Sequence, residues 1–385
     1  MGRIAVVGGT VLNPEAGTAE RADLVVDNGV LVDAPAGAEA PPGMDVAVER
    51  VDATGCYVCP GFIDLHTHVF NHPEFGAGRV PADRIGVQQG VAVVVDAGSS
   101  GAATIDAFPD VVINAQATRV FAFINIGSPG LPNLGGGHAS RPELCDLDGV
   151  VKAFDRHGDW LVGVKVLASQ SHTGSFGLEA VKLARKAAEL VGRPLMLHVG
   201  NAPPVIDDVL DLLRAGDIVT HTYHGKVGGV LGYRDRIIPA FAEAVARGVI
   251  VDLGHGRSSF SFRVCERALA QGMPLHTISS DLHRGNVERF AVSLARTMTK
   301  LRLLGLTVED VVEKVTLAPA RAIGIDRLGF GRLAPGLTRA LTVFREREAA
   351  LEVEDAQGEV RVADRIIEPL GVILDGRFHP LAAPV

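Results

Sequence analysis

Hydrophobic and polar positions follow two different patterns along the chain, and the change falls near residue 60. Residues 3–52 contain short apolar runs separated by tight turns, and Asn28-Gly29 between two of these runs is typical of a two-residue β-hairpin. We therefore expect a small β domain at the amino terminus. A proline-rich stretch within it, residues 34–43, predicts an exposed loop.

From Gly61 onward, strand-like apolar runs alternate with helical segments, which is the pattern of a parallel sheet. Several runs consist almost entirely of Val, Ile and Leu, as expected for strands covered on both faces. One helical segment, residues 177–193, carries apolar residues at helical spacing and stops at Gly192. The predicted strands span residues 61–68, 91–98, 119–127, 161–168, 194–200, 218–225, 249–256 and 275–283.

Eight strand-helix units predict an α/β fold, a closed (β/α)₈ TIM barrel, with an open doubly wound sheet as the alternative. Helical segments continue from Asp281 to about Ile325, and the tail is again strand-like over residues 331–344 and 365–378. The simplest arrangement pairs this tail with the amino-terminal strands. We therefore expect two domains: a small composite β-sandwich formed by residues 1–59 and 326–385, and a catalytic barrel formed by residues 60–325.

Composition narrows the function classes. With 47% hydrophobic and 21% charged residues, the 385-residue chain is not a disordered protein. A net charge of -8 argues against binding to nucleic acid or an anionic membrane, so a small-molecule substrate is expected, with a homo-oligomer as a possible assembly.

No signal-peptide layout or membrane-length apolar run is present, which predicts a cytoplasmic protein. Cys56 and Cys59 are interpreted as core thiols, because no second pair completes a zinc site.

The segment PGFIDLHTHVF, residues 60–70, places two histidines at the end of an apolar strand. Side chains two residues apart in a strand point to the same face, so His66 and His68 can bind one ion. Barrel enzymes keep their chemistry at this carboxyl end of the strands. For this motif alone, two ordinary loop histidines are the alternative.

Polar residues follow the apolar part of five predicted strands and would converge on one mouth of the barrel. Each alone could be a core or loop residue, but the set favours a metal site. Four neutral imidazoles and a carboxylate suit Zn²⁺, and less selectively Mn²⁺, Fe²⁺ or Co²⁺. The set comprises His66 and His68 on the first strand, Lys165 on the fourth, His198 on the fifth, His221 on the sixth and Asp281 on the eighth.

Lys165 needs a separate explanation, because a free ammonium cannot bind a metal. Carboxylation of its amine by CO₂ would produce a carbamate able to bridge two cations. The alternative is a lysine that pairs with Asp281 or with a substrate anion.

These motifs resemble those of the amidohydrolase superfamily, in the binuclear branch shared by dihydroorotases, hydantoinases and D-aminoacylase-like deacetylases. PGFIDLHTH is similar to the strand-one signature of that family, GVKV to its strand-four lysine, and LHVG, THTYHG and SSDLH to its sites on strands five, six and eight. The resemblance covers nearly the whole chain. It is strongest to the deacetylase subgroup, whose members hydrolyse acylated amino acids or acetyl esters of 2-hydroxy acids.

The resemblance implies two divalent metal ions, with zinc as the expected element. His66, His68 and Asp281 would hold the more buried ion and His198 and His221 the other, with carboxylated Lys165 and a hydroxide between them. Two positions depart from the family pattern. Ala340 stands where the family usually has Asp, and Leu167 stands where related chains often have Arg, which removes an anion contact from that loop.

The expected reaction is metal-assisted hydrolysis of an amide or ester bond in a small acylated amino acid or acylated 2-hydroxy acid. A cation pair lowers the pKa of its bridging water from about 15.7 toward about 7, which makes hydroxide available as the nucleophile at neutral pH. Asp281 would take the proton of the water and pass it to the leaving group. The alternatives are a cyclic-amide hydrolase of the dihydroorotase or hydantoinase kind and a metal-free scaffold barrel. A mononuclear deaminase has no use for Lys165.

A substrate carboxylate would need cationic or hydroxyl partners at the mouth of the barrel. Five candidates lie just beyond strands six, seven and eight: Tyr223, Lys226, Arg257, His283 and Arg284. His224 and His255 could also face substrate or support the ligands. His172 is expected in a loop over the site.

Overall fold

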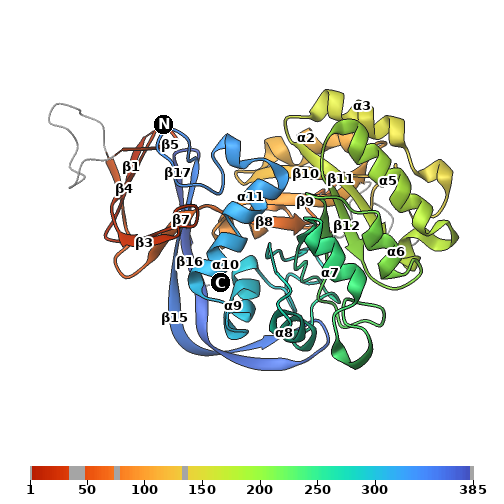
Figure 1. The fold of residues 1–385 in the computed structure, drawn as a ribbon. Coiled ribbons are helices and arrows are strands. Elements are labelled where there is room, and N and C mark those ends of the chain that lie inside the picture. Colours follow the sequence, from red (N-terminus) through yellow and green to blue (C-terminus); the bar gives the residue numbers. More distant parts are fainter. Residues whose placement is uncertain (1, 34–47, 73–78, 132–137, 382–385) are drawn as a thin grey trace.

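In the computed structural model, which describes residues 2–33, 48–72, 79–131 and 138–381, a parallel barrel lies beside a β domain (Figure 1). The predicted proline-rich loop lies outside the described residues. Seven barrel strands form one parallel sheet, in the order β14-β13-β12-β11-β10-β9-β8. Their bounds are β8 Phe62–Thr67, β9 Val91–Gly101, β10 Arg119–Asn125, β11 Leu161–Ala168, β12 Leu195–Val199, β13 Ile218–Thr220 and β14 Ile250–Val251.

The segment 275–283 closes the barrel without being a regular strand, so the prediction of an eighth full strand is wrong. It makes isolated parallel bridges to both neighbours, Thr277 to Asp252 and Leu282 to Thr67. Its polar groups bond to buried carboxylates and do not form a continuous backbone hydrogen-bond ladder. Asp64 accepts from the backbone N–H of Ser280 (3.0 Å), and Asp252 accepts from the Thr277 hydroxyl (2.7 Å).

Helices surround the barrel strands (Figure 1). Helix α5, Leu178–Val191, buries its alanine-rich face and stops at Gly192 as predicted, with that glycine in the left-handed conformation (φ 61°). Among the described residues, no helix combines the length and apolar composition needed to cross a membrane. The other α-helices are α1 Ala82–Ile85, α2 Phe108–Val111, α3 Leu147–His157, α4 Gln170–Thr173, α6 Ile206–Asp211, α7 Pro239–Ala246, α8 Phe262–Ala270, α9 Leu294–Leu303, α10 Val308–Lys314 and α11 Leu317–Ile323.

Two further sheets bring the ends of the chain together. One has the order β5-β4-β1-β6, and the other, β17-β16-β15-β7-β2-β3, combines strands from both termini. Ile4, Val26 and Leu341 belong to one buried cluster that joins the two sheets as a sandwich. Their strands are β1 Arg3–Val7, β2 Thr10–Asn13, β3 Thr18–Arg21, β4 Leu24–Asp27, β5 Val30–Val32, β6 Val48–Asp52, β7 Tyr57–Pro60, β15 Ala340–Glu354, β16 Val360–Leu374 and β17 Arg377–Pro380.

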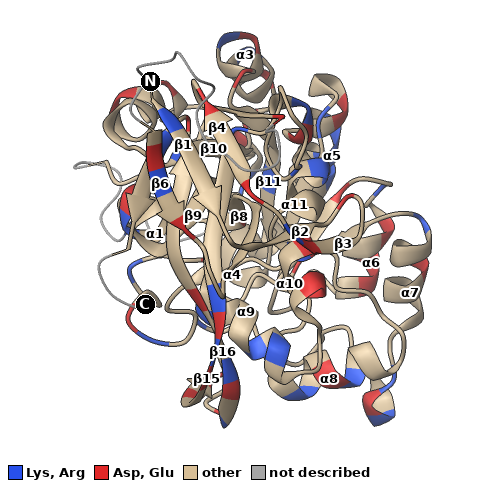
Figure 2. Ribbon diagram, turned by 90° about the vertical axis from the view of Figure 1, so that its left-hand side faces the viewer, with Lys and Arg blue, Asp and Glu red and all other residues tan. Residues whose placement is uncertain are grey.

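The hairpin signal at Asn28-Gly29 is confirmed, because β4 pairs antiparallel with β5 and both turn residues have positive φ (49° and 85°). The hairpin of β15 and β16 extends beyond the sandwich along the barrel, where its far part carries many charged residues (Figure 2). Glu368 there pairs with both Arg345 and Arg347.

Candidate metal centre

The carboxyl ends of the barrel strands bring all six predicted ligand residues into one cavity of about 460 Å³. His66 and Lys165 lie within β8 and β11, and His198 lies within β12. The remaining three, His68, His221 and Asp281, lie just beyond a strand or in the closing segment. The full lining is His66, His68, Arg79, Leu131, Lys165, Leu167, His172, His198, His221, Arg257, Asp281, His283, Arg284 and Gly285.

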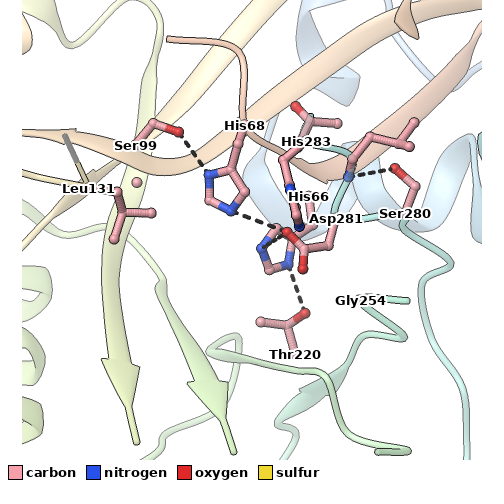
Figure 3. A network of polar contacts seen from close by, with 12 residues as sticks. His66, His68, Ser99, Leu131, Thr220, Gly254, Ser280, Asp281 and His283 are labelled. Atoms are coloured by element: carbon pink, nitrogen blue, oxygen red, sulfur yellow. Dashed lines mark hydrogen bonds and ion pairs between the residues drawn. The ribbon is translucent and has the colours of Figure 1, made fainter. Parts of the chain in front are cut away.

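His66, His68 and Asp281 lie close enough to hold one ion, since a ligand atom from each lies within 4.8 Å of the other two. Asp281 Oδ1 is 3.2 Å from His68 Nε2 and 3.5 Å from His66 Nε2 (Figure 3). Burial raises the pKa of Asp281, but His66, His68 and His221 outweigh it and hold that pKa well below its usual range. The carboxylate therefore offers acceptor oxygens to a cation at neutral pH.

A buried hydrogen-bond chain fixes the tautomer of His66. The Thr220 hydroxyl donates to Asp252 Oδ2 (2.6 Å), so its oxygen must accept from His66 Nδ1 (2.9 Å). The hydroxyls of Thr277 and Ser279 also donate to Asp252. His66 Nε2 is thereby left with a lone pair directed toward Asp281, as a metal ligand requires.

His221 is oriented in the same sense, because its Nδ1 donates to the carbonyl of Gly254 (2.7 Å), which can only accept. Burial lowers the pKa of His221 to about 3, so the ring is neutral. His221 and Asp281 both have positive φ (65° and 51°), a backbone conformation that is uncommon for non-glycine residues, although Asp and His adopt it more often than most. The ring of His198 lies 4.3 Å from that of His221, centroid to centroid.

Lys165 is fully enclosed among these groups. Its Nζ lies 3.3 Å from His66 Nε2, and burial lowers its pKa to about 7. Gly98, within the carboxyl-terminal part of β9, provides the space for it, because a Cβ at that position would lie 2.7 Å from the Cβ and Cγ atoms of Lys165.

The predicted substrate contacts divide into two groups. Arg257, His283 and Arg284 line the cavity, whereas Lys226 is not among its lining residues. Tyr223 is wrong as a substrate contact: its side chain is fully buried, and its hydroxyl donates to the Pro274 carbonyl (2.6 Å). At a strand end, an aromatic residue can pack into the core or face the mouth of the barrel. Nothing in the sequence distinguishes these two cases.

Two histidines outside the set of six predicted ligand residues lie in different places. His172 lines the cavity, as expected, whereas His255 is buried behind it and accepts from Lys300 (2.7 Å). Arg79 lines the cavity but was missed by the sequence reasoning, because it lies eleven residues after His68 in a segment without a motif. The feature of the sequence that could have indicated Arg79 is a basic residue in the segment that follows the first barrel strand.

Comparison with known proteins places the chain in a family. It is 38% identical over 327 residues to a deacetylase of Agrobacterium fabrum, covering 83% of this chain and 78% of that protein. A deacetylase of Enterococcus faecalis is 37% identical over 333 residues, covering 84% of this chain and 87% of its relative. No family model matches the chain.

Two solved structures have nearly the same fold over the full length. A crystal structure described as a dihydroorotase has a TM-score of 0.90 at 30% identity and covers 100% of this chain and 99% of that chain. One described as an adenine deaminase also has a TM-score of 0.90 at 30% identity, with coverage of 99% and 100%.

A parallel barrel with histidines, a carboxylate and a lysine gathered at its mouth defines the class of metal-dependent TIM-barrel hydrolases. Within this class, the chain belongs to the amidohydrolase superfamily, in the subgroup that contains the deacetylases of A. fabrum and E. faecalis. The predicted fold class and superfamily are thereby confirmed.

Proposed function

We propose that this hydrolase cleaves the acyl amide or ester bond of a small acylated amino acid or acylated 2-hydroxy acid. The observation that carries the proposal is the convergence of six ligand-type side chains in one cavity, with Nδ1 of His66 and of His221 each donating to a protein oxygen so that Nε2 carries the lone pair. The names of the two deacetylase relatives support an acyl group as the part removed.

His66, His68 and Asp281 would hold one divalent cation, His198 and His221 a second, and Lys165 as a carbamate would lie between them. Neutral imidazoles with a carboxylate make zinc the expected element. Such ions, when bound, supply an activated water and polarise the scissile carbonyl.

Asp281 is the catalytic residue for proton transfer in this proposal. Its carboxylate is unprotonated at neutral pH and lies at the centre of the ligand group, within reach of a water placed there. It accepts the proton of the attacking water and delivers it to the departing nitrogen or oxygen. No seryl or cysteinyl intermediate is required.

The cavity wall suits a small acid. Arg257, His283 and Arg284 provide positive charge or hydrogen-bond donors, while Leu131 and Leu167 provide apolar surface. We further propose that residues 60–325 form the catalytic barrel and that residues 1–59 and 326–385 form a supporting β domain. We also propose that the protein is cytoplasmic.

A cyclic-amide hydrolase is the second candidate, because the structure described as a dihydroorotase is similar over the full length. A substrate panel separates the two. We expect turnover of one enantiomer of N-acetyl-leucine or of O-acetyl-2-hydroxy-4-methylpentanoate, and little of dihydroorotate or hydantoin. Asp281→Asn provides the inactive control, and elemental analysis should find about two divalent ions per chain. Selective ring opening, or full activity with one ion or none, would contradict the proposal.

A further inference from the structure

Arg79 is unusual among the arginines of the cavity because it is buried. Its residue exposure is 8%, whereas Arg257 and Arg284 are exposed at the rim. Burying a guanidinium is costly unless an anion and hydrogen bonds compensate for the lost water. A buried cation in a ligand cavity therefore requires a partner.

Within the part of the chain that the structure describes, no carboxylate lies within 4.0 Å of the Arg79 guanidinium. The nearest acidic charges act on it only through space and already have other partners. Asp96 accepts from the backbone N–H groups of Val69 (2.8 Å) and Ser99 (2.7 Å). Asp281 faces the ligand histidines. The charge of Arg79 is thus available to an anion from outside.

Arg79 is also fixed relative to the metal ligands. Its Nη2 donates to the Leu131 carbonyl (2.5 Å), and the Leu131 N–H donates to the Ser99 carbonyl (2.8 Å). The hydroxyl of Ser99 contacts His68 Nδ1 (2.8 Å), so one chain of contacts joins His68 to the guanidinium, with Ser99 and Leu131 both visible beside His68 in Figure 3. In addition, the N–H of Val80, the next residue, donates to the carbonyl of His68 (3.3 Å).

We propose that Arg79 is the principal receptor for the substrate carboxylate and that Arg257 and Arg284 at the rim contribute less. This inference rests on the proposed function and refines it. A guanidinium that donates one N–H to Leu131 keeps further N–H groups for two carboxylate oxygens. Because the receptor is held rigidly beside His68, it sets the separation between the carboxylate and the acyl group to be cleaved, with the apolar side group of the acid against Leu131 and Leu167.

The test compares each acetylated acid of the leucine type with its neutral primary amide. Arg79→Gln should lower kcat/KM for the acid by about 10- to 100-fold, the range of charge-assisted hydrogen bonds, and change it by less than about threefold for the amide. Arg79→Lys should recover part of the loss, since it keeps the charge but not the paired donors. Arg257→Gln and Arg284→Gln should each have smaller effects. Arg84→Gln, at an exposed arginine paired with Glu288, is the matched control and should have none.

Calorimetric binding of 2-hydroxy-4-methylpentanoate separates this inference from the proposed function. Binding that weakens in Arg79→Gln and is partly restored in Arg79→Lys supports the receptor role, even if wild-type protein hydrolyses none of the acyl acids. Equal losses for acid and amide in both Arg79 variants would mean that Arg79 only holds the Leu131 loop, and would overturn the inference. So would a larger effect at Arg257 or Arg284.

Discussion

At the scale of single residues, hydroxyl groups that touch neither metal nor substrate decide which ring nitrogens are free. Thr220 is the clearest case, because its one proton goes to Asp252 and it must accept from His66. Thr220→Val keeps the shape and removes this partner. We expect metal affinity to fall by about 10- to 100-fold, measured by titration against a competing chelator.

The matched control is Thr222→Val, two residues away. Thr222 is equally buried, but its hydroxyl donates to the Val219 carbonyl rather than to the ligand network. It should lose some stability while keeping metal affinity. Equal affinity loss in both variants would show that strand packing, rather than the orientation of His66, is responsible.

The second residue-scale prediction concerns carboxylation of Lys165. A charged ammonium among histidines and cations would repel the ions, whereas a carbamate carries negative charge and two oxygens. Restoring metal to stripped protein in CO₂-depleted buffer should give poor recovery, and added bicarbonate should improve it. Lys165→Ala should lose metal and turnover, with partial rescue by a small carboxylic acid. An alanine variant with full metal content and turnover would make Lys165 an ordinary buried lysine.

The sequence could predict the residues that strand alternation and strand ends place at the mouth, such as His66 and Asp281. It could not predict Arg79 or the Thr220–Asp252 contact. Thr220 ends β13 and Asp252 directly follows β14, and their hydroxyl-carboxylate contact depends on the register in which these two neighbouring strands pair. The position of Arg79 depends on the Leu131 carbonyl, which is distant in sequence.

At the scale of elements, Gly98 within β9 shows how a backbone position supports a site. Gly98 has φ 82°, and an added Cβ would lie 2.7 Å from Lys165. Gly98→Ala should therefore displace Lys165 and lower kcat/KM by about 100-fold, the effect of roughly 1 Å of misplacement. Gly17→Ala is the control, because Gly17 also has positive φ (66°) but no atom within 4 Å of the added Cβ.

Both alanine variants should lose about 1–2 kcal/mol of unfolding free energy from the left-handed backbone, measured by urea denaturation. Only Gly98→Ala should lose activity and metal. Unchanged kinetics in Gly98→Ala would mean that Lys165 tolerates displacement.

Element types were predictable where periodicity was regular, as in α5 and the β4–β5 hairpin. The irregular structure of residues 275–283 was not predictable, because their order of apolar and polar residues resembles that of a strand. In the structure, their polar groups bond to Asp64 and Asp252. Periodicity describes which face a side chain occupies and carries no information about which partner its backbone finds.

At the scale of the whole molecule, the hairpin of β15 and β16 connects the β-sandwich to the barrel. Strand β16 packs along α9, and the N–H of Ile367 donates to the Thr299 hydroxyl (3.1 Å). The next residue on α9, Lys300, is fully buried. Its Nζ donates to His255 Nε2 (2.7 Å) and to the Phe290 carbonyl (2.6 Å), so Lys300 links α9 to the segments that carry His255 and Phe290.

Lys300 should make the stability of the whole fold depend on pH. Burial lowers its pKa to about 7 in the folded protein, from an ordinary value of 10.5. Between these two values the unfolded chain binds a proton that the folded chain does not, so the free energy of unfolding should rise with pH across this interval. Below about pH 7 the folded protein must also carry the charge, and this contribution to the slope disappears.

Lys300→Met should flatten that dependence, because the replacement has similar length and no titrating group. Urea denaturation at several pH values between about 7 and about 10 would measure the difference in slope between the variant and wild type, to which other titrating groups contribute equally. Lys182→Met, at an exposed lysine paired with Glu179, is the control and should leave the slope unchanged. If the Lys300 variant and wild type gain stability in parallel as the pH rises, the ammonium of Lys300 stays protonated in the folded protein and another group is responsible for the dependence.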